Sequence, residues 1–234
     1  GYAVEWRVIN AAEYGMPQRR KRVYIMAYRT GTSMNKAIKN LAKKGKAFDW
    51  VSKSGIMNDA FPMDFESSSA NLFELEGELA EISENTVDFN AKRRPFANAG
   101  VMLDRQVYTA SGSAQYTGEF ETLDDILLDE KDVSPEFFIS PEELETWTYL
   151  KGSKKEKRTT KAGYEYNYSE GPVTFPDALD RASRTIITGE GGRGASRFKH
   201  VIKTKSGKHR RLTPVELERL NQFKDNHTAG ESDT

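Results

Sequence analysis

The chain has 234 residues, of which 37% are hydrophobic and 30% are charged. This is the composition of a water-exposed globular protein, long enough for one sizeable domain or two small ones. The sequence has no cysteine, which excludes disulfides, thiolate nucleophiles and cysteine-ligated zinc. No window approaches the ~18 continuous apolar residues of a membrane span, and no secretory signal begins the chain, so we expect a cytoplasmic protein without a membrane partner.

The net charge is zero, from 35 basic and 35 acidic residues, but the charges are segregated along the chain. Basic residues cluster in 19–46 and again in 181–211, and acidic residues cluster in 119–136. A neutral total argues against a protein that simply coats DNA, whereas two basic segments around an acidic one fit a polyanion-binding face. A single basic run is usually a solvated face. The glycines and small polar residues within the second run favour nucleic acid.

The first 50 residues predict two strands and a helix. Residues 3–9 and 23–28 are rich in Val, Ile, Tyr and Trp, which is typical of strands. Between them, Gly15 and Pro17 indicate a turn. Apolar residues at helical spacing in a lysine-rich context predict a helix over 35–46.

The middle of the chain predicts shorter elements. Glycine, proline and a serine run make 52–70 a loop, and 72–84 could be an acidic helix or irregular. Two short strands are predicted at 100–103 and 106–110, followed by a short helix at 123–128. The sequence Ser-Pro-Glu-Glu then predicts a helix beginning at Ser140, because it supplies an N-cap, a first-turn proline and first-turn acids.

The last third begins with a basic segment, 151–162, that is predicted to be an exposed linker or a hairpin. Alternating tyrosines at 164, 166 and 168 predict a half-exposed strand and are more often sheet-face residues than base-stacking platforms. We expect a strand at 184–188 that enters a glycine loop at 189–194.

Two further elements close the chain. Residues 198–204 and 208–212 are predicted to form a hairpin turned at Ser206-Gly207. Thr213-Pro-Val-Glu216 is a capping box, which predicts a helix to about Phe223 with Leu217 and Leu220 inward.

Two motifs carry possible chemistry. Gln18-Arg19-Arg20-Lys21-Arg22 places a glutamine and three arginines on a turn between buried strands, which suits phosphate contact and equally suits a salt-bridged rim. Gly189–Gly194 fits the G-x-G-x-x-G fingerprint of dinucleotide binding, but no predicted helix follows it and no acidic residue stands about 20 positions later. Glycines flanked by Arg193 and Arg197 better suit close approach to DNA. The histidines, His200, His209 and His227, form no convincing metal set.

Three segments, in the same order along the chain, resemble conserved parts of the DNA (cytosine-5) methyltransferases. Asn10–Ile25, which includes Met-Pro-Gln-Arg-Arg-Lys-Arg-Val-Tyr-Ile, strongly resembles the family's eighth motif. Ser183-Arg-Thr185-Ile186 leading to Gly191-Gly192 is similar to the threonine, aliphatic residue and glycine loop of its target-recognition domain. The segment from Arg211 to Phe223 resembles the ninth motif, with matches at Arg211, Pro214, Glu216 and Arg219.

This resemblance implies a Rossmann-like α/β parent enzyme. The chain would hold the last strands of the catalytic sheet in 1–45, a mixed α+β target-recognition domain in 46–212, and the ninth-motif helix with a truncated tail in 213–234. The two N-terminal strands would come from a parallel sheet and leave an apolar face and an unpaired edge, so the isolated chain is expected to aggregate or associate.

The resemblance also implies the chemistry of the intact enzyme, which methylates C5 of a cytosine flipped out of duplex DNA, with S-adenosylmethionine as methyl donor. The family's nucleophile is a cysteine, which this chain lacks, and its cofactor motifs are expected before residue 1 and after residue 228. We therefore assign no catalytic residue and no metal ligand. The missing catalytic half and double-stranded DNA are the expected partners, in a restriction-modification system.

The expected site is therefore one of DNA recognition. Residues expected to contact DNA are Gln18, Arg19, Arg20, Arg22, Thr185, Ile186, Gly191, Gly192, Arg193 and Arg197. Residues expected to be structural are Arg211, Pro214, Glu216 and Arg219. Two alternatives stay open: a non-enzymatic DNA-binding module, and the large subunit of a split enzyme complemented in trans.

Overall fold

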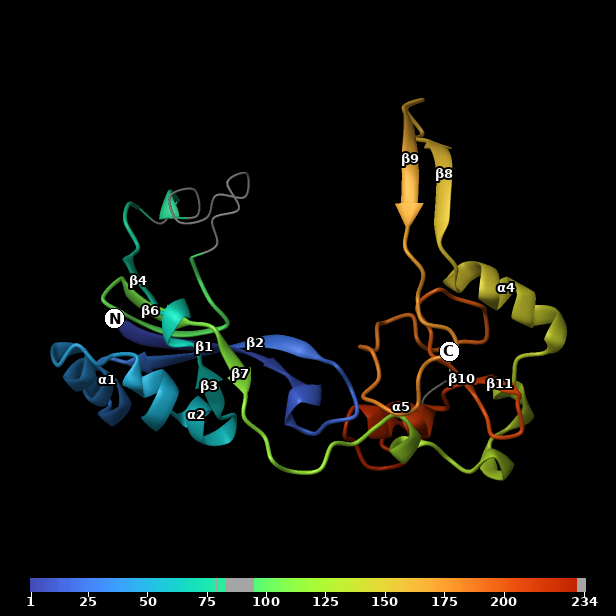
Figure 1. Cartoon of the computed structure of the whole chain (residues 1–234), viewed down its shortest axis with the longest axis horizontal. Coiled ribbons are helices and arrows are strands. Elements are labelled where there is room, and N and C mark those ends of the chain that lie inside the picture. Colours follow the sequence, from blue (N-terminus) through green and yellow to red (C-terminus); the bar gives the residue numbers. More distant parts are fainter. Residues whose placement is uncertain (79, 83–94, 231–234) are drawn as a thin grey trace. The chain divides into compact units, whose positions relative to one another are not determined.

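The computed structural model describes residues 1–78, 80–82 and 95–230. The chain forms two compact units (Figure 1). Unit 1 comprises residues 1–15 and 20–119, and unit 2 comprises residues 16–19 and 120–234. This division differs from the predicted boundaries after residues 45 and 212, because strands at 99–110 pair with the N-terminal strands.

Unit 1 is built on a five-stranded antiparallel sheet in the order β2-β1-β5-β6-β4. Its strands are β1 (Tyr2–Asn10), β2 (Lys21–Arg29), β4 (Asn71–Glu74), β5 (Ala99–Leu103) and β6 (Gln106–Ala110). The strands predicted at 3–9, 23–28, 100–103 and 106–110 are thus confirmed, whereas β4 lies where the sequence predicted an acidic helix or irregular structure. The expectation of a parallel sheet is wrong for the described residues, because the short turn at Gly15 returns the chain directly alongside β1.

Helices and a small second sheet complete unit 1. They are α1 (Ser33–Lys43), a π-helical turn (Trp50–Ser54), α2 (Ile56–Ala60), and the pair β3 (Met63–Phe65) and β7 (Gly112–Ala114); single 3-10 turns occupy Ala11–Tyr14 and Ser67–Ser69. The helix predicted at 35–46 is confirmed, with Thr32 accepting from the Asn35 amide at its start. The loop predicted at 52–70 is wrong, since Trp50, Val51 and Met57 are buried and order this segment. Part of the uncertain segment 72–84 lies outside the described residues.

The inner face of β1 combines apolar and charged side chains. Alternate residues along this strand are buried, and they include Glu5 and Arg7, whose side chains are fully inaccessible. Glu5 Oε2 accepts from Tyr28 Oη at 2.8 Å and Trp50 Nε1 at 2.9 Å. Arg7 donates to three main-chain carbonyl oxygens, of Val51, Met57 and Phe61. The charged pair therefore ties the π-helical turn and α2 to the sheet.

The far edge of this sheet is open. Among the described residues β2 pairs only with β1, and Val23, Tyr24 and Ile25 on it are 57%, 51% and 66% exposed. The predicted apolar, unpaired edge is thus present. Such an edge is a template for further pairing, which supports the expectation that the chain associates.

Unit 2 has little regular structure. It contains α4 (Pro141–Lys151), the hairpin β8 (Lys154–Thr159) and β9 (Glu165–Glu170), the hairpin β10 (Val201–Lys203) and β11 (His209–Arg211), and α5 (Pro214–Leu220). Three 3-10 turns, Asp124–Ile126, Glu130–Asp132 and Pro135–Phe137, precede α4. Its apolar cluster is small and holds Leu123, Ile126, Ile202, Leu212 and Leu220.

Most of the secondary-structure elements predicted for unit 2 are confirmed. Thr213 forms the predicted capping box, and the predicted N-cap Ser140 forms a complete capping box with Glu143. The predicted hairpin of β10 and β11 forms, whereas the segment predicted as a linker or hairpin at 151–162 supplies β8, which pairs with the predicted tyrosine strand as β9. Leu220 is buried and Leu217 packs on the apolar cluster, so the predicted inward face of α5 is confirmed, although the helix ends at Leu220. The strand predicted at 184–188 is wrong: only Ser183 forms a bridge, and the residues after it bond through side chains.

Candidate nucleic-acid interface

The eighth-motif turn and the segment at 183–186 lie side by side within unit 2. Ser183 N donates to Pro17 O at 2.7 Å, and Arg19 N donates to Ser183 O at 2.7 Å. The Thr185 hydroxyl donates to Arg19 O at 2.5 Å. The turn at Gln18 and the 183–186 segment, which the sequence predicted as two separate motifs, therefore form one short parallel bridge with Arg19 beside Thr185.

The Gln18 side chain is buried at the centre of this bridge and is 2% exposed. Its Nε2 donates to Leu220 O at 3.0 Å and to Asn221 Oδ1 at 3.2 Å. Its Oε1 accepts from Ile186 N at 3.3 Å. Gln18 was expected to touch DNA, but its amide is used inside unit 2, where it connects the end of α5 to the 183–186 segment.

The arginines of the motif are placed differently from Gln18. Arg19, Arg20 and Arg22 are all exposed. Among the described residues the guanidinium groups of Arg19 and Arg20 have no partner, and that of Arg22 meets only the carbonyl of Lys21. Arg19 belongs to unit 2, where it lines a shallow hollow with Arg181 and Arg184. Free guanidinium groups of this kind suit phosphate oxygens.

The glycine loop, residues 189–194, is held by side chains rather than by a strand. Lys199 Nζ donates to Gly192 O at 2.9 Å and to Gly194 O at 2.7 Å, and Arg211 Nη1 donates to Gly192 O at 2.8 Å. Burial is the main cause that lowers the pKa of Lys199 and of Arg211 below their usual ranges. Gly192 has a φ of +76°, where a side chain would be strained.

The same loop is anchored at its start by a buried carboxylate. Glu190 Oε1 accepts from His200 N at 2.6 Å and lies 2.9 Å from His200 Nδ1. On the other side of the ring, His200 Nε2 lies 2.7 Å from Ser183 Oγ. This Glu190–His200–Ser183 chain joins the glycine loop to the bridge at Ser183. It is inaccessible to a substrate because all three side chains are buried.

The two arginines flanking the glycine loop have different surroundings. Arg193 is 79% exposed and pairs with Glu136 at 2.5 Å. Arg197 is 12% exposed; its Nε pairs with Glu170 at 2.8 Å, and its other nitrogens donate to the carbonyls of Leu150, Gly152 and Gly171. Arg197 thus joins the start of β8 to the end of β9 through these bonds, whereas Arg193 lies at the surface.

The ninth-motif residues have structural surroundings. Glu216 is fully buried, accepts from the amides of Leu128 and Thr213, and forms a two-pronged ion pair with Arg210 at 2.6 and 2.8 Å. Arg211 also donates to Glu136 O, and Arg219 donates to Ile126 O and pairs with Asp225. Pro214 is the first residue of α5. Sequence reasoning counted Arg210 only within a basic run and missed its role as the buried partner of Glu216.

A second buried charge cluster was also missed. Asp177 accepts from Val201 N at 2.9 Å and pairs with Arg184 at 2.8 Å. Arg184 and the buried Lys151 both donate to the carbonyl of Lys199. Burial, with a smaller contribution from Arg184, lowers the pKa of Lys151 to about 8. No single residue here carries a sequence signal, because the cluster assembles only when residues from 151 to 201 meet.

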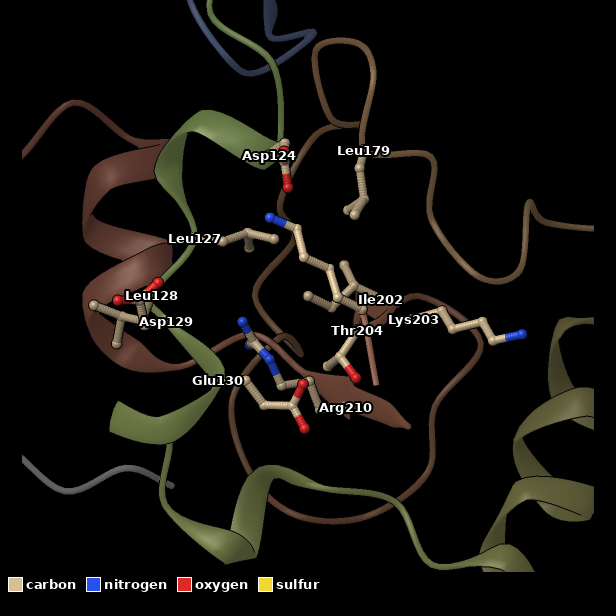
Figure 2. A pocket seen from close by; sticks show the side chains of 11 residues that line it. Asp124, Leu127, Leu128, Asp129, Glu130, Leu179, Ile202, Lys203, Thr204 and Arg210 are labelled. Carbon is tan, nitrogen blue, oxygen red and sulfur yellow. The ribbon is translucent and has the colours of Figure 1, made fainter. Parts of the chain in front are cut away.

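A further hollow lies in unit 2 beside β10 (Figure 2). Leu127, Leu179 and Ile202 line it, and Arg210 reaches it while bound to Glu216. Glu130 at its rim is already bound to Ser206 at 2.6 Å. The lining is thus the edge of the small apolar cluster, with one of its acids, Glu130, already bound.

Within residues 1–78, 80–82 and 95–230, no three His, Cys, Asp or Glu side chains are grouped so that they could hold a metal ion. In the same part of the chain, no helix combines the length and apolar character needed to cross a bilayer.

Comparison with known proteins places the chain in a family. The family model for C-5 cytosine-specific DNA methylase matches residues 1–234. The chain is 35% identical over 232 residues to the type II methyltransferase M.Sau3AI of Staphylococcus aureus, which covers 98% of the chain and 52% of that protein. It is 62% identical over 29 residues to the type II methyltransferase M.MthTI of Methanothermobacter thermautotrophicus, covering 12% of the chain and 9% of that protein.

No solved structure matches the chain. The chain spans about half the length of M.Sau3AI, the relative that it matches along nearly its whole length. The match to the family model over every residue shows that this chain belongs to the C-5 cytosine-specific DNA methylase family.

Proposed function

We propose that this chain supplies DNA recognition for a restriction-modification methyltransferase that methylates cytosine C5 in a specific duplex sequence. The observation that carries the proposal is the bridge between the eighth-motif turn and the 183–186 segment, which sets the unpartnered Arg19 beside Thr185. Unpartnered cations lie here next to a polar segment and an anchored glycine loop. Such a surface suits DNA recognition, because the cations can bind phosphates and so position the duplex, while the neighbouring residues contact the base edges.

Each site residue has a proposed role. Arg19, Arg20 and Arg22 contact phosphates, and Arg193 exchanges its exposed partner Glu136 for a phosphate or a guanine. Thr185, Ile186, Gly191 and Gly192 approach the bases. Gln18 and Arg197 are reassigned to positioning roles, because the protein itself occupies their polar groups. Arg211, Pro214, Glu216 and Arg219 hold the ninth-motif helix.

The chemical step requires groups that this chain does not contain. In this family a thiolate activates the cytosine ring, and S-adenosylmethionine supplies the methyl group when it is bound. The chain has no cysteine, so we propose that it does not transfer methyl groups by itself and that a catalytic half is its protein partner. The residues of this chain bind the duplex and hold the glycine loop in place.

The test of this proposal is duplex binding by the 234-residue chain. Fluorescence anisotropy with a pool of randomised duplexes, followed by sequencing of the bound fraction, is expected to give salt-dependent binding and an enriched sequence. Arg19→Gln is expected to weaken binding to all duplexes alike. The matched control is Lys53→Gln, which removes one exposed positive charge elsewhere. Absence of binding, or binding without any enriched sequence, would contradict the proposal.

The lack of cysteine also supports a second candidate, a DNA-binding module without an enzymatic role. The two are separated by mixing the chain with a family catalytic half that carries the cofactor and cysteine motifs, in the presence of duplex DNA and labelled S-adenosylmethionine. Methyl transfer in the mixture, and none with either part alone, is expected for the first candidate. Enriched binding with no transfer at any ratio would favour the second.

A further inference from the structure

The β8–β9 hairpin stands apart from the rest of unit 2. Its strands pair with each other in register from Lys154↔Glu170 to Thr159↔Glu165. In Figure 1 the two strands extend away from the end of α4, and no other element runs beside them. An isolated two-stranded hairpin is marginally stable in water, so its base needs support from the fold.

That support comes from the segment that follows the glycine loop. Arg197 pairs with Glu170 at 2.8 Å and bonds to the carbonyls of Gly152 and Gly171, which flank the two strands. Lys154 adds a second pair with Glu170 at 3.7 Å. Arg197 is three residues from Gly194, so its bonds link the base of the hairpin to the segment that follows the glycine loop.

The two faces of the hairpin differ in how their charges are used. On one face, Arg158 pairs with Glu156 at 3.1 Å and lies over the ring of Tyr168 at 3.5 Å. Tyr149 of α4 packs against this face, with its hydroxyl 3.3 Å from Glu156 and Lys154 over its ring. This face is therefore neutral and is occupied by the protein's own contacts.

The opposite face carries Lys155, Lys157 and Thr159 on β8 and Glu165, Asn167 and Ser169 on β9, with Lys155 opposite Ser169, Lys157 opposite Asn167 and Thr159 opposite Glu165. All six residues are exposed. Among the described residues their side chains form no hydrogen bond or ion pair. The face thus presents two free cations and an amide that offers both a donor and an acceptor, while its one acid, Glu165, lies at the turn end of the hairpin and leaves the face with a net positive charge. It has no apolar side chain for a lipid surface or a hydrophobic protein partner.

The dimensions of the hairpin suit duplex DNA. Paired strands lie about 4.8 Å apart, and the major groove is about 12 Å wide and admits a two-stranded ribbon. Residues on one face repeat every two positions, or about 6.8 Å, which corresponds to two base-pair steps. Lysine suits phosphate, and the asparagine amide can bond to both edge groups of adenine.

We propose that the Lys155–Lys157–Asn167–Ser169 face of the β8–β9 hairpin enters a groove of duplex DNA, with the lysines on phosphates and Asn167 at a base edge. This inference rests on the proposed DNA-recognition function and adds to it a second contact surface beyond the glycine loop. Arg197 is then the residue that sets the spacing between the two surfaces.

The test uses the whole chain and compares variants in duplex binding across salt concentrations. Lys155→Gln/Lys157→Gln is expected to lower the slope of log affinity against log salt by about 1.8, since each phosphate contact contributes about 0.9. Lys155→Arg/Lys157→Arg is expected to keep the slope. Lys43→Gln/Lys44→Gln, which removes two exposed charges from α1, is the control. A hairpin variant whose slope equals that of the parent or of the control would overturn the proposal.

A second arm tests the base contact. Asn167→Ala is expected to change the base preference at one position of the enriched sequence and to lower affinity for that sequence about tenfold. Asn40→Ala on the exposed side of α1 is the control. Unchanged preference in Asn167→Ala would overturn the base contact.

The two proposals fail in different ways. A parent chain that binds no duplex refutes the recognition function and the hairpin proposal together. Sequence-selective binding that Arg19→Gln weakens, but that all hairpin variants retain, refutes the hairpin proposal alone.

Discussion

The two units of this chain use charged residues in different ways. Unit 1 has a five-stranded sheet that satisfies most of its backbone groups, and it buries one principal charged pair of residues, Glu5 and Arg7, beneath an apolar cluster. Unit 2 has short strands and long connections, so many carbonyl groups lack a ladder partner. There Lys151, Arg184, Arg197, Lys199 and Arg211 all donate to main-chain carbonyls, a role that Arg7 also has in unit 1.

This difference indicates that many basic residues of unit 2 have a structural role. A buried carbonyl without a partner is costly, and a charged donor can satisfy two or three of them at once. Several arginines and lysines that look like DNA contacts in the sequence therefore stabilise the fold. Under the proposed function, the cations that would contact DNA are those without internal partners, such as Arg19 and Lys157. The predictions below test this distinction.

The largest effect is expected from Glu216→Ala. It leaves Arg210 buried with no counter-charge and removes the acceptor of two main-chain amides. Removing one partner of a buried ion pair costs about 3–5 kcal/mol. The free energy of unfolding, measured by urea denaturation, is expected to fall by that amount. Glu145→Ala, at an exposed position of α4, is the control and is expected to change it by less than about 0.5 kcal/mol.

Lys199→Met is expected to have an intermediate effect. Methionine keeps the length of the side chain but cannot donate to Gly192 and Gly194, and hydrogen bonds from charged groups are worth about 1.5–3 kcal/mol. We expect faster amide hydrogen exchange in residues 189–194 and weaker duplex binding. Lys203→Met, an exposed lysine on β10, should leave both unchanged. Equal exchange in Lys199→Met and the parent would show that the loop is ordered by something else.

Glu5→Gln tests the buried charge of unit 1 through pH. Burial raises the pKa of Glu5 above its usual 4.5, despite the hydrogen bonds from Tyr28 and Trp50. The folded state then binds more protons than the unfolded state between pH 4.5 and the folded pKa, so the stability from this group is lost as pH rises through that window. The unfolding free energy of the parent minus that of Glu5→Gln is expected to fall with rising pH and then level off. A difference independent of pH would contradict the assignment.

The smallest effect is expected for an exposed ion pair of unit 1. Lys53 and Asp49 lie 3.1 Å apart at i,i+4 spacing, and the Lys53 side chain is 69% exposed. Pairs of this kind contribute about 0.3–0.5 kcal/mol and are screened by salt. The free energy of unfolding of Lys53→Ala, measured by thermal denaturation, should be lower than that of the parent by no more than that amount. A loss comparable with that of Glu216→Ala would remove the distinction between buried and exposed charges.

The sequence predicted what depends on local chemistry. Strand composition located β1 and β2, an N-cap serine followed by proline and acids located the start of α4, and a capping box located the start of α5, because these signals act within a few residues. The eighth- and ninth-motif resemblance also identified the family. The pairing of β5 with β1 was not predictable, because Arg7 and its partner Ala99 lie 92 positions apart in the sequence and no local pattern selects the partner.

The candidate site was predicted less completely than the fold. The sequence identified the arginines and glycines but could not distinguish Arg19 from Arg197, because the partners of Arg197 come from residues 150 to 171. The role of Gln18 was similarly ambiguous in the sequence. In the fold its side-chain amide donates to Leu220 O at the end of α5 and accepts from Ile186 N. Whether a cation is free depends on which carbonyls the folded chain leaves unpaired, and that is a property of tertiary structure.

The central claim is that free cations bind DNA and engaged cations hold the fold. Its most direct test compares Arg19→Gln/Arg20→Gln with Arg197→Gln in both duplex binding across salt and urea unfolding. We predict that the first variant lowers the salt slope by about 1.8 and keeps the parent's stability, whereas the second lowers stability. The reverse result, with stability lost at Arg19 and Arg20 and the salt slope lost at Arg197 in a fully stable protein, would contradict this account.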